Sequence, residues 1–232
     1  MQPETLLLDC TLRDGGYYND WDFSRDLIQA YLEAMKAAQV DIVELGFRFI
    51  KNDGFKGPCA YTTDDFIRSL DIPEGLTVGV MLNGSDVLTD LGLEPTLDLL
   101  FPETAETSPV ELVRFACHFR EFKAVLPAVK WLSERGYRVG FNLMQIADRS
   151  YEEVRDLART ARDWPIEALY FADSMGSMTP EDTSRIIGWL REEWTGPLGI
   201  HTHDNMGKAI DNTLIASAND VSWLDCTITG MG

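Results

Sequence analysis

Two histidines, His201 and His203, lie two residues apart directly after the short apolar segment 198–200. Alternate residues of a β-strand project from the same face, so the two imidazoles would point the same way. Such a pair at the carboxyl end of a strand is a common way to hold one divalent metal ion, although it could also be a partly buried, hydrogen-bonded pair. The polar segment 204–207 then leads into a helical pattern. This position favours a metal site, because α/β proteins bind ligands at this edge of their sheets.

The elements that must position these histidines alternate between strand and helix along the whole chain. Apolar, strand-like segments recur about every thirty residues and are separated by helical segments. The predicted strands are 5–10, 40–46, 76–82, 111–117, 137–143, 168–172, the segment from 198 that carries the histidines, and 221–227. This alternation predicts an α/β fold, a (β/α)8 TIM barrel, with a doubly wound open sheet as the alternative.

Two observations favour the barrel over the open sheet. No Gly-rich phosphate-binding segment follows the first strand, as it does in open sheets that bind dinucleotides. Polar residues also recur at the carboxyl ends of the predicted strands, where barrel enzymes place their active sites. These residues are Arg13, Asp14, Glu44, His118, Asp173, Ser174, His201 and His203.

The strand and helix pattern is weakest between residues 83 and 109. We expect a short helix near 86–91 and a loop in this region, and the segment 97–101 competes with 111–117 as the fourth strand. Elsewhere helix starts are marked clearly, for example by the capping pair Ser150 and Glu153.

The barrel has a chemical consequence for Asp14. The first and seventh strands are both odd-numbered, so their inward residues share layers, and Asp14 would face His201 and His203 across the barrel mouth. An Asp-His-His set leaves coordination positions open for substrate and water, so such a metal could polarise a carbonyl and hold an enolate. Arg13 would add a second positive charge beside the developing oxyanion.

Glu44 is a carboxylate within the otherwise apolar segment 40–46. A buried carboxylate needs a partner, and Arg13 and Arg48, both at strand ends, are the candidates. We therefore place Glu44 in the site.

Composition restricts the class of protein. The chain has 232 residues, 45% of them hydrophobic, which is enough for one domain over residues 1–232 with a full core. A formal charge of −18 argues against nucleic acid or an anionic membrane as a partner. We find no run of eighteen apolar residues and no basic leader, and so expect a cytoplasmic protein. The four cysteines are widely spaced, as free buried thiols are.

Several motifs together resemble those of a known superfamily. They are Leu8-Asp9-Cys10-Thr11-Leu12-Arg13-Asp14-Gly15, Glu44-Leu45-Gly46, Asp173-Ser174-Met175-Gly176, His201-Thr202-His203-Asp204-Asn205-Met206-Gly207 and Asp225-Cys226-Thr227-Ile228-Thr229-Gly230-Met231-Gly232. In this order they resemble the metal-dependent TIM-barrel aldolases, lyases and synthases: 4-hydroxy-2-oxovalerate aldolase, hydroxymethylglutaryl-CoA lyase, and isopropylmalate and homocitrate synthase. The chain is most similar to the first branch.

The resemblance implies an enzyme that makes or breaks carbon–carbon bonds of a small 2-oxo acid through a metal-bound, pyruvate-type enolate. It implies that Asp14, His201 and His203 ligate the metal and that Arg13 stabilises the enolate. Glu44 would organise the site, and Ser174 would touch the substrate carboxylate. The implied metal is Mn or Mg, with Zn or Co as alternatives.

The chain departs from these families at Tyr17. The aldolase branch has a histidine base at this position, three residues after the metal aspartate. A phenol with a pKa near 10 is a poor base at neutral pH. Three hypotheses follow: Tyr17 acts as an acid or orienting group with metal-bound water as the base, His118 is the base, or the aldolase activity is absent.

The second departure is at the end of the chain, where the family continues into an eighth helix. We therefore expect a C-terminally truncated barrel that lacks its last helix, with an additional segment, a partner or a second copy covering the exposed strands. The alternatives to the aldolase are a Claisen-type acyl-CoA synthase and a metal-binding barrel without catalysis.

Overall fold

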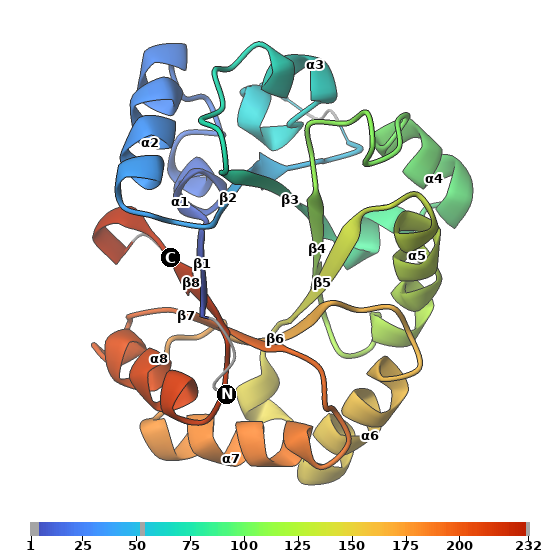
Figure 1. Cartoon of the computed structure of the whole chain (residues 1–232). Helices are drawn as coiled ribbons and strands as arrows, with labels where there is room; N and C mark the ends of the chain where they lie inside the picture. The colour runs from blue at the N-terminus through green and yellow to red at the C-terminus, as the bar shows by residue number, and fades with distance from the viewer. Residues whose placement is uncertain (1–4, 52–53, 231–232) are drawn as a thin grey trace.

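Eight parallel strands close into a barrel in the order of the sequence (Figure 1). The structure is a computed structural model that describes residues 5–51 and 54–230. The strands are β1 Leu6–Asp9, β2 Ile42–Phe47, β3 Thr77–Asn83, β4 Leu112–Cys117, β5 Arg138–Leu143, β6 Ala168–Asp173, β7 Leu198–Thr202 and β8 Trp223–Cys226. Strand β1 pairs with both β2 and β8, which closes the sheet. The predicted (β/α)8 barrel is therefore confirmed, and the open sheet is excluded.

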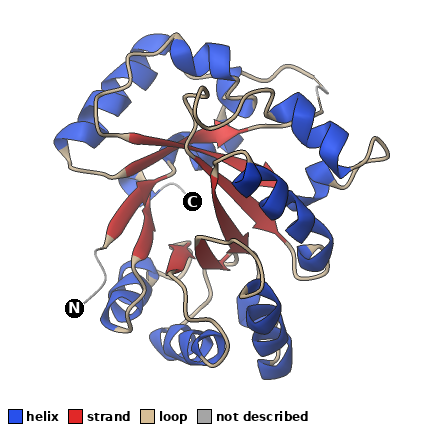
Figure 2. Ribbon diagram, turned by 45° about the vertical axis from the view of Figure 1, so that its right-hand side comes forward, coloured by secondary structure: helices blue, strands red, loops and turns tan. Residues whose placement is uncertain are grey.

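Helices surround this barrel on its outer face (Figure 2). They are α2 Arg25–Ala37, α3 Asp64–Arg68, α4 Leu93–Leu100, α5 Phe122–Glu134, α6 Tyr151–Ala161, α7 Pro180–Arg191 and α8 Ala209–Ala218. The short helix α1 Thr11–Gly15 instead follows β1 directly, and all of its residues are buried. Helix α6 begins with the predicted capping box of Ser150 and Glu153, and α7 begins with a second one, of Thr179 and Asp182. Each box satisfies backbone N–H groups that a helix start otherwise leaves unpaired.

The weakly patterned region differs from its prediction. Residues Gly84–Val87 form a 3-10 turn, and the regular helix begins later, at Leu93. Most of the segment 97–101 therefore belongs to α4, so 111–117 was the correct choice for the fourth strand. In α4 the side chain of Leu97 is buried whereas Leu99 is 66% exposed, as expected for a helix packed on one face.

The barrel interior is built in layers. Its apolar layer includes Leu8, Ile42, Leu112 and Trp223, which belong to one core cluster. Residues two positions further along a strand point the same way and form the next layer toward the carboxyl ends. That layer contains Cys10, Glu44, Arg114 and Asp225, so charged groups replace apolar ones just below the barrel mouth.

The outer side of β1 and β8 lies between α2 and α8 (Figure 1). In the described part of the chain, β8 is followed only by the 3-10 turn Ile228–Gly230. Beside this face, Ile210 and Leu214 of α8 are 75% and 63% exposed. Among the helices of residues 5–51 and 54–230, none combines the length and the apolar character needed to cross a membrane.

Candidate metal centre

The backbone turns into helix α1 immediately after β1, and this turn directs Arg13 and Asp14 inward. The Asp9 carboxylate fixes the turn, because its Oδ1 accepts hydrogen bonds from the Thr11 N–H at 2.8 Å and from the Tyr31 hydroxyl at 2.7 Å. Arg13 and Asp14 are only 4% and 9% exposed. The first strand therefore delivers a carboxylate and a guanidinium together to the barrel mouth.

Strand β7 delivers the two histidines to the same place. Nε2 of His201 lies 3.2 Å from Nε2 of His203, and it lies 3.9 Å from Oδ2 of Asp14. Metal–ligand bonds of about 2.1 Å separate neighbouring ligand atoms by roughly 3 to 3.5 Å. The structure therefore places His201 next to both other residues predicted as ligands, and its spacing from His203 is that of two ligands of one ion.

The charges of this set also suit a metal. Burial raises the pKa of Asp14, but Arg13 and His201 outweigh burial, so the pKa is lowered and the carboxylate is ionised. Burial and the adjacent His201 lower the pKa of His203, which keeps its imidazole neutral. An ionised carboxylate and a neutral imidazole are the forms that bind metal.

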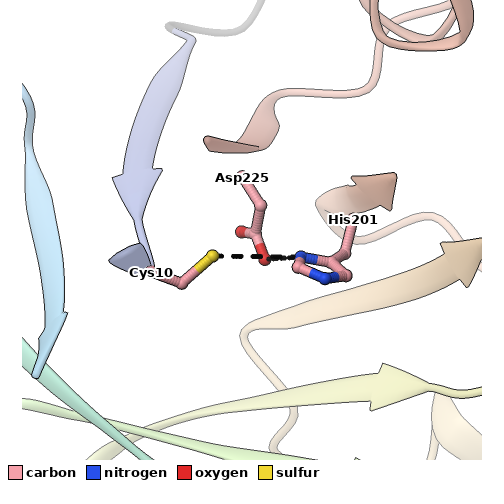
Figure 3. Close-up of side chains that lie close together, drawn as sticks. All are labelled: Cys10, His201 and Asp225. Atoms are coloured by element: carbon pink, nitrogen blue, oxygen red, sulfur yellow. Dashed lines mark hydrogen bonds and ion pairs between the residues drawn. The ribbon is translucent and has the colours of Figure 1, made fainter. Parts of the chain in front are cut away.

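A second cluster lies at Nδ1 of the His201 ring (Figure 3). Ligand atoms of Cys10, His201 and Asp225 all lie within 4.8 Å of one another. Burial, reinforced by Asp14, raises the pKa of the Cys10 thiol well above its usual range, so the thiolate that metals prefer is disfavoured. Both oxygens of Asp225 accept hydrogen bonds from Nη1 of Arg114 at 2.9 Å. This cluster therefore fits a divalent metal less well than the first one.

The shortest contact in the second cluster explains what it does. Oδ2 of Asp225 lies 2.9 Å from Nδ1 of His201. A carboxylate at this position accepts the Nδ1 proton and leaves Nε2 free for a metal, as is usual for metal-binding histidines. Asp225 thus orients the His201 ring through its Nδ1 atom.

Glu44 lies beside Arg13, and Arg13 is the one of its two predicted partners that is correct. Its Oε1 pairs with Nε of Arg13 at 3.0 Å. Arg48 instead bonds to Asp64 and to the backbone oxygens of Thr62 and Leu100.

The second partner of Glu44 is Arg114, whose Nε and Nη2 donate to the carboxylate at 2.7 and 3.0 Å. Sequence reasoning missed Arg114, Asp225 and Cys10 as site residues. Arg114 and Asp225 are charged residues within strands β4 and β8, the same signal that singled out Glu44.

Tyr17 lies in the 3-10 turn that follows α1, and its side chain is 66% exposed. Its ring nevertheless packs edge-on against Trp21 and Phe47, with centroids 4.8 and 6.0 Å apart. Partial burial, opposed by Arg13 and reinforced by Asp14, raises the pKa of Tyr17. The phenol is therefore protonated at neutral pH, which favours the role of an acid over that of a base.

His118 and Ser174 lie elsewhere on the barrel mouth. His118 lines a hollow of about 360 Å³ beyond β4 and β5, together with Gln145 and Arg149. Ser174 accepts a hydrogen bond from the Gln145 N–H at 3.1 Å. Within the described ranges, neither side chain has a hydrogen bond or ion pair with Asp14, His201 or His203, so their roles stay predictions.

A pocket of about 340 Å³ opens directly onto the two histidines. Asp225 and Cys10 line its inner side, and Ile210 and Leu214 of α8 line its outer side. The polar floor and apolar wall give a small substrate a place to bind beside the candidate metal site.

The fold and the site together define a (β/α)8 barrel with a candidate divalent-metal centre at the carboxyl ends of its strands. Residues 109–232 match the family described as HMGL-like, and the chain belongs to this family.

Two curated relatives are each 26% identical to this chain over 99% of its length. They are named oxaloacetate decarboxylase, from Mycobacterium tuberculosis, and 4-hydroxy-2-oxovalerate aldolase, from Pelotomaculum thermopropionicum. The chain spans 66% of the length of each relative.

Solved structures show the same fold. The N-terminal domain of a provisionally assigned aldolase from Bacteroides vulgatus superposes with a TM-score of 0.83 at 28% identity, over 98% of this chain and 74% of that one. Hydroxymethylglutaryl-CoA lyase from Pseudomonas aeruginosa superposes with a TM-score of 0.76 at 16% identity, over 99% of this chain and 78% of that one.

Proposed function

We propose that the chain is a divalent-metal-dependent carbon–carbon lyase that acts on a small 2-oxo acid through a pyruvate-type enolate. The observation that carries this proposal is the set of buried Asp14, buried His201 and half-buried His203 at the barrel mouth, with Arg13 beside it. The names of the two relatives support it, because retro-aldol cleavage of 4-hydroxy-2-oxovalerate and decarboxylation of oxaloacetate both leave the enolate of pyruvate.

Asp14, His201 and His203 would hold the metal. Two nitrogens and one carboxylate oxygen suit Mn or Mg completed by water, and Zn or Co are the alternatives. When bound, the metal would supply Lewis-acid polarisation of the 2-oxo group.

Arg13 is the residue that would stabilise the developing oxyanion. Its Nη2 lies 3.0 Å from Oδ2 of Asp14, and its backbone oxygen accepts a hydrogen bond from the Trp21 indole at 2.9 Å. Glu44 holds the other side of the guanidinium. A buried, fixed positive charge stabilises an oxyanion without the reorganisation that water would need.

Tyr17 is proposed as the proton donor to the enolate, since its phenol is protonated and near Asp14 and Arg13. For the aldol reaction a base is also required, and metal-bound water or His118 are the candidates. Ser174 is the candidate for binding the substrate carboxylate.

Decarboxylation of a 2-oxo diacid is the second candidate function. Loss of carbon dioxide produces the enolate without removal of a proton, so this reaction needs an acid such as Tyr17 but no base. The raised pKa of Tyr17 favours this candidate over a reaction that depends on a tyrosine base.

The test is deuterium exchange at the methyl group of pyruvate in heavy water. The protein is incubated with Mn or Mg, quenched with a chelator and analysed by proton NMR. We expect loss of the methyl signal with wild type and not with His201→Ala, and retention of exchange in His118→Ala if His118 is not the base. The proposal fails if a folded, metal-binding sample exchanges no methyl protons with any divalent metal.

We also propose that residues 1–232 act as one catalytic domain in the cytoplasm, with a further segment or a second copy covering the outer side of β1 and β8 beside α8. The exposed side chains of Ile210 and Leu214 support a covering surface. Light scattering that shows a single monomer, without binding of a hydrophobic dye, would contradict it.

A further inference from the structure

Arg114 is a fully buried arginine at the centre of the barrel. It projects from β4, across the interior from β1 and β8, and its guanidinium lies 4.6 Å from the ring centroid of Tyr170. Two nitrogens bond to Glu44, at 2.7 and 3.0 Å. The third nitrogen donates to both oxygens of Asp225, at 2.9 Å each. One planar group therefore holds two buried carboxylates.

Each of these two carboxylates also contacts a different residue of the candidate site. Glu44 pairs with Nε of Arg13 at 3.0 Å, and Asp225 contacts Nδ1 of His201 at 2.9 Å. Arg114 itself makes no hydrogen bond or ion pair with Asp14, His201 or His203 in the part of the chain that the structure describes. It can act on the site only through its two partners.

We propose that Arg114 is a positioning residue that fixes the Arg13 guanidinium and the His201 ring at the same time, through Glu44 and Asp225. This inference rests on the proposed function, because it concerns the oxyanion and metal groups of that site. The oxyanion branch is Arg114–Glu44–Arg13, and the metal branch is Arg114–Asp225–His201.

The chemistry of arginine explains why this position needs it. The guanidinium presents donors on fixed sides of one plane, so it can serve two carboxylates in defined directions. A lysine ammonium carries the same charge but acts as a point donor. In Arg114→Lys the two carboxylates would keep their counter-charge and lose their fixed orientation.

Arg48 provides a matched control. It is also buried, pairs with the carboxylate of Asp64, and lies 4.5 Å from the ring centroid of Phe101. Its partners lie outside the candidate site. Arg48→Lys therefore makes the same chemical change in a similar environment, without touching either branch.

The first measurement is the tautomer of the histidine rings in the metal-free protein. The chain has 3 histidines, so a sample labelled with ¹⁵N-histidine gives a simple long-range proton–nitrogen spectrum. It is recorded at one fixed pH above 8 for all variants, and His201→Gln assigns the His201 signals. We expect the proton on Nδ1 of His201 in wild type and Arg48→Lys, and a mixture of both tautomers in Arg114→Lys.

The second measurement separates the branches. We expect Asp225→Asn to disturb the His201 tautomer and to weaken Mn²⁺ binding by about tenfold or more. We expect Glu44→Gln to leave Mn²⁺ binding near wild type and to slow pyruvate exchange. Arg114→Lys should show both effects. If Arg114→Lys does not fold, the two single-branch variants still test the arrangement.

The inference is overturned if folded Arg114→Lys keeps the wild-type tautomer and Mn²⁺ affinity, or if Arg48→Lys changes them equally. It is also overturned if Asp225→Asn and Glu44→Gln both behave as wild type. A disturbed tautomer in Arg114→Lys, in a protein whose wild type binds no divalent metal, would support the positioning role and reject the proposed function.

Discussion

Oδ2 of Asp225 lies 2.9 Å from Nδ1 of His201, whereas Nε2 of the same ring lies 3.2 Å from Nε2 of His203. The two ring nitrogens of His201 thus have different partners. One is held by a buried carboxylate, and the other is presented at the barrel mouth.

Asp14→Ala should abolish metal binding, because it removes the only carboxylate of the predicted ligand set. Isothermal titration with Mn²⁺ measures the effect. The matched control is Asp173→Asn, since Asp173 is also buried at a strand end but accepts hydrogen bonds from the N–H groups of Ser177 and Met178. Wild-type affinity in folded Asp14→Ala would reject Asp14 as a ligand.

Arg13→Lys should slow pyruvate exchange by about 10²- to 10³-fold, the usual effect of losing one oxyanion donor. Lysine keeps a positive charge but cannot bridge Asp14 and Glu44 as the guanidinium does. Mn²⁺ affinity should change much less than the rate. A proportional loss of both would indicate that Arg13 serves metal binding instead.

Tyr17→Phe should lower the rate of enolate protonation by about 10²- to 10⁴-fold, the range for a general acid. The pKa of Tyr17 is raised above the ordinary tyrosine value of about 10. The wild-type phenol is therefore still protonated at pH 10 and stops acting as an acid only at higher pH. The pH–rate profile should therefore show no fall between pH 6 and 9 that arises from ionisation of Tyr17. Steady-state rates across this range, with Tyr18→Phe as the control, check the prediction.

The lowered pKa of His203 predicts a dependence of stability on pH in the metal-free protein. As the pH falls through about 6.5, the unfolded chain takes up a proton that the folded imidazole does not, so the free energy of unfolding falls. Urea unfolding at several pH values between 8 and 5 measures this loss. His203→Gln should show a smaller loss, and an identical slope would contradict the assignment.

Arg48→Leu should destabilise the fold by about 3 to 5 kcal/mol, because it leaves the buried carboxylate of Asp64 without its partner. Arg68→Leu should destabilise the fold much less, since its pair with Glu103 is exposed to solvent. Chemical denaturation compares the two variants. Similar losses would show that burial does not distinguish these ion pairs.

The sequence by itself determined the barrel and the ends of its strands. Capping residues such as Ser150 act through bonds to backbone groups a few residues away, so short segments define the helix starts. The alternation of strands and helices then restricts the topology, because parallel strands need crossover connections. The approach of Asp14 to His201 followed from this topology.

Only the tertiary structure decided which charged groups share a layer. Glu44 and Arg114 lie 70 residues apart, and Arg114 and Asp225 lie 111 apart. Their contacts depend on the register in which the strands close, and a shift of one residue would turn each side chain to the opposite face. Arg48 was an equally reasonable partner for Glu44 in the sequence, and only the closed barrel placed it beside Asp64 instead.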